Sequence, residues 1–316
     1  MWVPRQRLRD GPPARPAPKQ AGRMRARLVA IQAGTGASMS RQLHALLCWE
    51  ANETNSWNPI LADLLRAEGV AVTEVHDLSS LMALDLGEFD VCLPRFRVGA
   101  AHMTCLDEWL VESGIPMLNA RDVRRRCENK ALAHLAFERR GIPQPPSFVV
   151  SCEGLFDRHA GWEGETVVKP LYGNRSSGIE VCPTLPQALE RACARGEDLL
   201  VQQMIWPARC WRVAVGRTTG VIDPYWREPP TEADRILSIS TGSTIARSGF
   251  SERIAVAAMA MLEAVDGDIL AVDMLETEDE VYALEINHNF DAHGGDAPAA
   301  EAFLREIHSK LGAAVA

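Results

Sequence analysis

Short apolar runs alternate with helix-like segments between residues 41 and 119, and this alternation restricts the fold more than any other feature of the chain. The run QLHALLCWE precedes SWNPILADLLRAEG, in which Ile60, Leu61, Leu64 and Leu65 have helical spacing, and VAVTEV follows as a strand. FDVCLPRFR, MTCLDEWLVESG and IPMLN then have the patterns of a strand, a helix and another strand. Such alternation predicts a parallel sheet with helices on its faces.

Polar residues follow the ends of these predicted strands, where open parallel sheets bind their ligands. Asn52, Asn55, Arg95 and Arg97 are therefore candidate substrate contacts. Each of them could instead be a solvated or capping loop residue, and for a single residue that interpretation is the commoner one.

The pattern changes after Asn119. A charged helical segment ends at Gly141, before the helix-stopping IPQPP. Four short β-like runs (SFVVS, ETVVKPLY, GIEVC and DLLVQQMI) then surround one helical stretch, LPQALERACARG, which predicts a compact α+β unit. Beyond Trp206 we expect strands over WRVAVG and GVIDPYWRE, a helix over SERIAVAAMAMLEAV, strands over DILAVDML and EVYALEIN, and a last helix over PAAEAFLREIHSKLG.

Acidic residues lie within the last two predicted strands, which the polar stretch ETEDE separates as in a hairpin. If the turn centres on Asp279, Asp273 lies opposite Glu285, and Asn287 shares the face of Glu285. An exposed hairpin could carry these residues on a solvated face. The dense apolar flanks favour a buried sheet instead, where facing carboxylates repel each other unless a cation lies between them. Oxygen ligands suit Mg²⁺ or Mn²⁺, so the hairpin predicts a metal site.

A second candidate site is the stretch VVKPLYGNRSSGIEV, in which Lys169 ends a strand-like run before a loop of small residues. The backbone N–H groups of such a loop, with Gly173, Asn174, Ser176, Ser177 and Gly178, can bind a phosphate that the lysine also contacts. A lysine at a strand end is more often only solvent-facing, and Lys130 is equally uninformative alone. The two lysines, the loop and the acidic hairpin make a stronger case together.

Charge and cysteine content limit the partners of this chain. The net charge is −9, but residues 1–27 carry eight Arg/Lys against one Asp, so the rest carries about −16 and repels nucleic acid. The eight cysteines lack metal-type spacing, as expected of reduced thiols in the cytoplasm. No apolar run approaches the roughly 20 residues of a membrane span. We expect residues 1–38 to be a disordered basic leader or translation from an over-early start, with Met24 or Met39 as later candidates; a basic interaction arm is the less favoured alternative.

Taken in order, several segments resemble the ATP-grasp superfamily, and within it carboxylate–amine ligases such as the ribosomal-protein glutamate ligase and the lysine-biosynthesis ligase. They are LPRFR, the segment 118–150, VVKPLYGNRSSGIEV, LVQQMI, WRVAVG and ILAVDMLETEDEVYALEINHN, which span most of residues 40–291. The resemblance implies an ATP-grasp fold of mixed α/β and α+β class. We expect an N-terminal parallel-sheet (pre-ATP-grasp) domain at 39–120, a small α+β subdomain with a lid loop at 121–198 and a C-terminal α+β subdomain with the metal site at 199–316, the two subdomains clamping ATP.

The resemblance also implies roles for individual residues. Lys130 and Lys169 would contact the ATP phosphates under a lid from Gly173 to Gly178 that includes Ser176 and Ser177, and the adenine would meet Gln203, Met204 and Ile205. Asp273, Glu285 and Asn287 match the metal ligands, Arg212 an arginine at the transferred phosphoryl group, and Arg247 one near the substrate. Arg95, Asn289 and Asp291 are candidate substrate contacts, and His288 and His293 lie in the same acceptor-facing segment.

Two positions depart from the family pattern: Cys210 stands where an acidic residue is frequent, and Gln203 replaces a common glutamate. An asparagine expected ahead of Arg247 has no clear counterpart, although Ser243 and Thr244 lie near that place.

We expect ATP-dependent formation of an amide or peptide bond through an acyl phosphate, with Mg²⁺ or Mn²⁺. The substrates would be a small-molecule or peptide carboxylate and an amine such as an amino acid; a homo-oligomer is common among such enzymes. The alternatives are a small-molecule kinase and a nucleotide-binding partner or regulatory protein with weakened catalysis.

Overall fold

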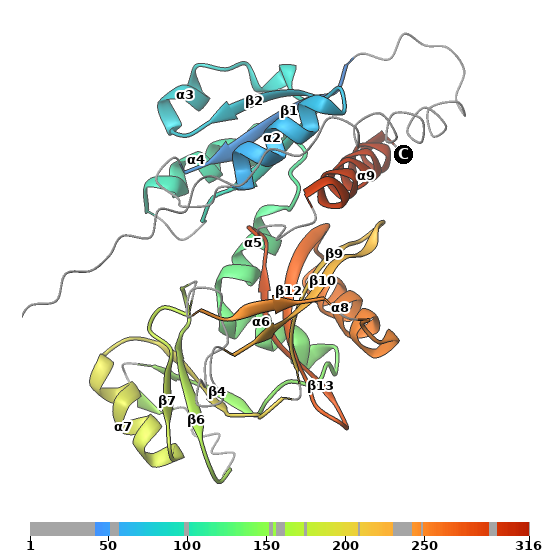
Figure 1. The fold of residues 1–316 in the computed structure, drawn as a ribbon. Coiled ribbons are helices and arrows are strands. Elements are labelled where there is room, and N and C mark those ends of the chain that lie inside the picture. Colours follow the sequence, from blue (N-terminus) through green and yellow to red (C-terminus); the bar gives the residue numbers. More distant parts are fainter. Residues whose placement is uncertain are drawn as a thin grey trace, which may run out of the picture. The chain divides into compact units, whose positions relative to one another are not determined.

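The structure is a computed structural model that describes residues 42–50, 57–97, 101–151, 154–155, 162–173, 176–207, 209–229, 242–247, 249–290 and 296–315. Residues 42–316 form one compact unit. Its helices and strands are drawn in Figure 1. Within the part of the chain that the structure describes, no helix combines the length and the apolar character needed to cross a membrane.

The first sheet is parallel, as the alternating pattern predicts. It consists of β1 (His44–Trp49), β2 (Ala71–Val75) and β3 (Val91–Arg95) in the order β2-β1-β3. The further strand expected over IPMLN is wrong as an extended element, because this segment forms only one parallel bridge, between Cys92 and Met117. The backbone there follows β3 too briefly to make a strand.

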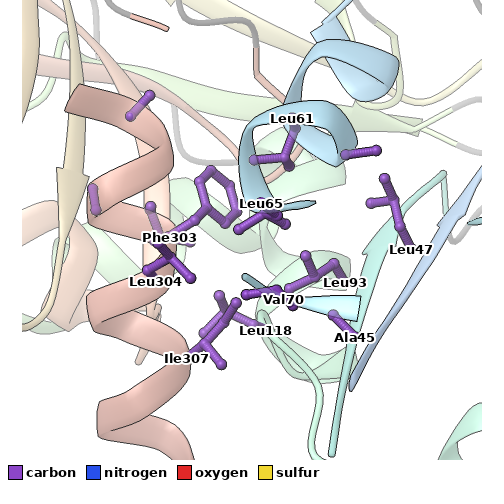
Figure 2. Packing of buried hydrophobic residues seen from close by; sticks show 14 of the residues in the cluster. Ala45, Leu47, Leu61, Leu65, Val70, Leu93, Leu118, Phe303, Leu304 and Ile307 are labelled. Atoms are coloured by element: carbon purple, nitrogen blue, oxygen red, sulfur yellow. The ribbon is translucent and has the colours of Figure 1, made fainter. Parts of the chain in front are cut away.

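Helices cover both faces of this sheet because its strands are apolar on both sides. On one face α2 (Trp57–Ala67) and α9 (Asp296–Val315) contribute to one buried cluster, in which Leu61 and Leu65 face Phe303, Leu304 and Ile307 (Figure 2). On the other face α4 (Ala101–Glu112) and the short α3 (Leu78–Met82) pack with a second cluster. A 3₁₀ turn at Leu86–Glu88 precedes β3.

The charged helical segment expected before Gly141 consists of two helices, α5 (Arg121–Glu128) and α6 (Lys130–Arg139). Asn129 separates them because its backbone is extended (φ −103°, ψ 108°). Its side chain accepts hydrogen bonds from the N–H groups of Ala131 and Leu132 and so caps α6. This cap makes Lys130 the first residue of α6.

The second sheet is antiparallel, with the order β5-β4-β8-β6-β7. Its strands are β4 (Ser147–Ser151), β5 (Gly154–Leu155), β6 (Thr166–Pro170), β7 (Glu180–Cys182) and β8 (Leu199–Gln203). The helix α7 (Leu185–Arg195) packs on one face through Ala188 and Ala192. The α+β unit predicted here is therefore present, and it includes β8, whose residues lie beyond position 198. The division into domains at 120 and 198 stays a prediction.

The third sheet is also antiparallel, with the order β11-β10-β9-β12-β13. Its strands are β9 (Arg209–Gly216), β10 (Gly220–Glu228), β11 (Thr244–Ala246), β12 (Ile269–Glu276) and β13 (Val281–Asn287). Apolar side chains of one face, such as Val213, Val272 and Met274, form a buried cluster with Ile254 and Met261 of α8 (Glu252–Ala264). The opposite face of this sheet carries the charged residues described below.

The buried amide of Asn119 fixes the start of β12. Its Oδ1 accepts hydrogen bonds from the N–H groups of Asp268 (2.8 Å) and Ile269 (3.0 Å), and its Nδ2 donates to the Ile269 carbonyl (2.7 Å). One side chain therefore pairs with this backbone as a neighbouring strand would.

Candidate functional site

Strand pairing gathers polar side chains on one face of the third sheet. Asp273 of β12 lies opposite Arg212 of β9 and Glu285 of β13, and Arg212 lies opposite Tyr225 of β10. Paired residues share a face, and so do residues two positions apart in a strand. We call this set the charged face; its members are Cys210, Arg212, Tyr225, Arg227, Asp273, Glu285 and Asn287.

Asp273 is the centre of the charged face. Arg212 Nη1 donates to its Oδ2 (2.9 Å) and Arg227 Nη2 to its Oδ1 (3.0 Å), while Asn287 Nδ2 lies 3.5 Å from Oδ2. Burial alone would raise the pKa of the Asp273 carboxyl, but the two guanidinium groups outweigh burial and hold this pKa below its usual value. Asp273 is therefore an anion under ordinary conditions.

The predicted pairing of Asp273 with Glu285 is present, although the hairpin turn differs from the one expected. Near the turn the register is Glu276 with Val281, which centres the turn half a residue earlier than Asp279. An extra residue on β13, Leu284, forms a bulge next to Glu285 and shifts the register, so that Asp273 faces Glu285. The bulge thus brings the two carboxylates to adjacent positions.

The oxygen donors of this hairpin fit a hard divalent cation. Two carboxylates and the amide of Asn287 share a face, and oxygen-rich sets of this type bind Mg²⁺ or Mn²⁺. Among the described residues, no group of three or more His, Cys, Asp or Glu side chains is placed to hold a metal by itself. A cation here would therefore need additional oxygen ligands, such as phosphate oxygens or water, and the metal role of the three residues stays a prediction.

Two lysines approach the charged face from other elements. Lys130 Nζ lies 4.0 Å from Glu285 Oε1 and donates to the Gly173 carbonyl (3.1 Å). Lys169 Nζ donates to Gln202 Oε1 (2.5 Å). Burial lowers the pKa of Lys169 to about 8; Glu285 opposes this shift and Lys130 adds to it. With Arg212 and Arg227, these lysines make cations outnumber the two carboxylates, which favours a polyphosphate ligand.

The loop after β6 has the backbone conformations of a tight small-residue turn. Gly173 and Gly178 have positive φ values, and so does Ser176 (φ 58°). At Gly178 (φ 71°) an added Cβ would lie 2.9 Å from Pro170 Cγ, so glycine is required there. Ser177 lies in this turn, and Arg195 Nη1 donates to the Gly178 carbonyl (2.7 Å). Asn174 lies outside the described residues.

The segment expected to meet adenine follows the end of β8. The Gln203 N–H donates to the Pro146 carbonyl and the Met204 N–H to the Glu165 carbonyl, both at 2.9 Å. These two amides are therefore used within the protein. An adenine base could therefore contact the Ile205 amide, which is the next one along the segment, or the carbonyls of these residues.

Arg247 lies beside the charged face rather than at Asp273. Its guanidinium carbon is 5.5 Å from the centre of the Tyr225 ring, and its Nη2 is 3.4 Å from Oδ1 of the buried Asp223. Asp223 shares this face because it lies two positions before Tyr225 in β10. The position of Arg247, separated from Arg212 by Tyr225, is compatible with a contact to a second substrate.

Arg95, a predicted substrate contact, is held by acceptors within the protein, and its role at a substrate stays a prediction. It is 1% exposed and donates to Asn58 Oδ1 (2.9 Å) and to the carbonyls of His288 (3.4 Å) and Phe290 (2.6 Å). Asn289 Nδ2 donates in turn to the Arg95 carbonyl (3.1 Å). The predicted contacts Asp291, Asn52 and Asn55, and also His293, lie outside the described residues.

His288 and Cys210 both have shifted pKa values. Burial lowers the pKa of His288, which contacts Glu128 Oε1 at 3.0 Å, so this histidine is held within the protein. Burial raises the pKa of the Cys210 thiol to about 11, so a neutral group stands where an acidic residue is frequent. Arg227, opposite Cys210, has Asp273 as its carboxylate partner instead.

Two residues of this site, Arg227 and Gln202, are not among the residues predicted from the sequence. Arg227 is two positions from Tyr225, and its strand position could have indicated the charged face once the pairing of β9 and β10 was known. Gln202 is 1% exposed within β8 and contacts Lys169. Its signal was a polar residue in an apolar strand, LVQQ.

Solved structures resemble this chain over most of its length, whereas no family model matches it. The D-alanine–D-alanine ligase from Bacillus anthracis complexed with ATP matches with a TM-score of 0.63 at 12% identity, covering 85% of this chain and 96% of that chain. A RimK domain ATP-grasp protein from Sphaerobacter thermophilus matches with a TM-score of 0.59 at 20% identity, covering 82% and 98%. The ATP-grasp ligase PsnB, complexed with a minimal precursor, matches with a TM-score of 0.62 at 15% identity, covering 84% and 100%. At these identities the similarity concerns the fold.

Proposed function

We propose that this chain is an ATP-dependent carboxylate–amine ligase. The premise is its ATP-grasp fold, which is expected from the sequence and which the similar solved structures share. The observation that carries the proposal is the charged face, where Asp273 and Glu285 lie among Arg212, Arg227, Lys130 and Lys169. Such a mixture of carboxylates and excess cations suits a metal–polyphosphate complex better than either ion alone. The similar structures that are named ligases support the same reaction class.

ATP would lie between the second and third sheets. Lys130 and Lys169 would contact its phosphates, and the N–H groups of the loop from Gly173 to Gly178, with Ser176 and Ser177, would close over them. The adenine would meet the backbone at Gln203, Met204 and Ile205. The loop would also keep water out, which a reactive phosphorylated intermediate requires.

Asp273, Glu285 and Asn287 would hold Mg²⁺ or Mn²⁺. When bound, such an ion neutralises phosphate charge and orients the transferred group. Asp273 is already ion-paired with two arginines, so its oxygens would be shared between these guanidinium groups and the cation. Glu285 is the less encumbered carboxylate, because its side chain is 27% exposed and its Lys130 contact is 4.0 Å long.

The reaction needs activation because a carboxylate is a poor acyl donor. Transfer of the γ-phosphoryl group to a substrate carboxylate oxygen gives an acyl phosphate and ADP, and attack by an amine then forms the amide and releases phosphate. Arg212 and Arg227 would stabilise the charge of the transferred phosphoryl group. Arg247 would contact a substrate, and Asn289 and Asp291 would border the acceptor. The acceptor would be an amino acid or another amine, joined to a small molecule or peptide.

The remaining partners follow from charge. The acidic body of the chain disfavours nucleic acid, and a reduced cytoplasmic setting fits its cysteines. A homo-oligomer is part of the proposal only by analogy with enzymes of this kind.

A phosphate-release screen with candidate carboxylates and amines, followed by mass detection of the product, tests the proposal. A ligase sustains ADP formation over many turnovers only when carboxylate and amine are both present, because the amine is needed to consume the acyl phosphate. ADP and a phosphorylated product formed without an amine would identify the alternative, a small-molecule kinase. Nucleotide binding without turnover would favour a partner or regulatory protein. This alternative is worth testing because the neutral Cys210 thiol stands where the family pattern often has an acidic residue.

A further inference from the structure

Three hydrogen bonds join Lys169 to the middle of the second sheet. Lys169 Nζ on β6 donates to Gln202 Oε1 on β8 (2.5 Å), and Gln202 Nε2 donates to Ser147 Oγ on β4 (2.9 Å). The Ser147 hydroxyl donates in turn to the Pro145 carbonyl (2.6 Å). Ser147 lies directly opposite Gln202 in the pairing of β4 with β8, so the sheet itself sets this geometry.

The direction of these bonds is determined by their chemistry. A serine hydroxyl has one hydrogen, and here it points to the Pro145 carbonyl, which can only accept. The Ser147 oxygen must therefore accept from the amide nitrogen of Gln202. That contact turns the amide oxygen of Gln202 toward Lys169, and the 1% exposure of Gln202 leaves little freedom for rotation.

We infer that Gln202 is a positioning residue that holds the Lys169 ammonium in place while leaving its charge available to a nucleotide phosphate; this inference rests on the proposed function. An ammonium has three donors, so one bond to Gln202 leaves two for phosphate oxygens. A neutral acceptor fixes the long side chain without cancelling its charge. A carboxylate at this position would make a buried ion pair that competes with the phosphate.

Lys169 has charged neighbours on other elements, but they do not replace this bond. Lys130 of α6 repels it, whereas Glu285 of β13 and Asp273 of β12 attract it. These two carboxylates are also the proposed metal ligands, so a cation would draw on the same oxygens. Gln202 lies in the sheet of Lys169 and is independent of that competition.

The test measures the Kd of the non-hydrolysable analogue AMP-PNP with Mg²⁺ for the full chain and its variants. Gln202→Leu should weaken binding about tenfold, the effect of a lost hydrogen bond to a charged group. Gln202→Glu should weaken it further, and Ser147→Ala should weaken it less. Gln187→Leu, the same change on the exposed face of α7, is the matched control and should leave Kd unchanged.

A double-mutant cycle with Lys169→Met separates positioning from a general role in packing. Gln202→Leu should have no further effect on Kd in the Lys169→Met background, whereas a packing defect would lower affinity in both backgrounds. The inference would be overturned, but the proposed function would stand, if folded Gln202→Leu or Gln202→Glu bound with wild-type affinity. Equal losses of affinity in both backgrounds would have the same consequence. Absence of AMP-PNP binding by the wild-type chain would overturn the proposed function itself.

Discussion

Arg95 at the end of β3 is buried and Arg212 and Arg227 of the charged face are partly buried, but these arginines are paired in opposite ways. Arg95 donates to a side-chain oxygen and two carbonyls. On the charged face, Arg212 and Arg227 converge on the single carboxylate of Asp273. Acceptors distributed around one guanidinium indicate an internal structural link. The two guanidinium groups on Asp273 carry more positive charge than that one carboxylate, and this excess is the charge that we propose for a further anion.

Glu285→Gln should have the largest effect of these variants and lower ligase or ATPase turnover about 1,000-fold or more. The reason is that a neutral amide neither holds a cation nor balances the charge of Lys130. The melting temperature should change little, since Glu285 is partly exposed. Turnover is measured by phosphate release and stability by thermal unfolding. Glu278→Gln, in the turn of the same hairpin, is the matched control. Unchanged turnover in Glu285→Gln would remove the metal assignment.

Asp273→Asn is the less selective variant of this pair. It should also abolish turnover, but it removes the carboxylate partner of both Arg212 and Arg227. Leaving buried charges without their partner typically costs about 3–5 kcal/mol. A loss of stability should therefore accompany the loss of activity here, unlike in Glu285→Gln.

Arg95→Met tests the arginine at the end of the parallel sheet, which we expect to stabilise the fold without contributing to nucleotide binding. It should lower the free energy of unfolding by about 3 kcal/mol, because three acceptors lose their buried donor. The affinity for AMP-PNP should stay the same, as Arg95 is not part of the charged face. Denaturant unfolding and the Kd of the same sample test both statements. Arg66→Met, which removes exposed ion pairs, should cost about 1 kcal/mol or less. A stable Arg95→Met protein with a raised KM for a substrate would restore the predicted substrate contact.

The smallest expected effect concerns the pH dependence of nucleotide binding. Because burial lowers the pKa of free Lys169 to about 8, its ammonium is lost as the pH rises through that value, and AMP-PNP affinity should fall. The decrease should be at most about tenfold per pH unit, measured between pH 7 and pH 9.5. Lys169→Met should bind weakly at every pH and show a flatter profile. Lys310→Met, which removes a lysine paired with Asp268, should keep the wild-type profile.

The parallel sheet, the α+β unit around LPQALERACARG and the pairing of Asp273 with Glu285 could be predicted because strand alternation and helical spacing are local patterns. The bulge at Leu284 has no local pattern that predicts it, since bulges arise from the fit between strands. Arg227 could not be placed on the charged face from the sequence, because that face depends on which strands are neighbours. The acceptors of Arg95 could not be predicted for the same reason, since they come from residues 58, 288 and 290, which are distant in sequence.

The amide of Asn119 has a consequence for how this chain tolerates changes of length. Asn119 and β9 both fix β12, so Asp273 keeps its side of the sheet whatever happens in the following turn. β13 is the outer strand, paired with β12 alone within the sheet. Deleting or inserting one residue in the turn would therefore move β13 by a single step and exchange its two faces, carrying Glu285 and Asn287 toward α8. The turn of this hairpin can therefore change length and keep the site only by an even number of residues. A change by one residue is tolerated only where the bulge in β13 compensates for it.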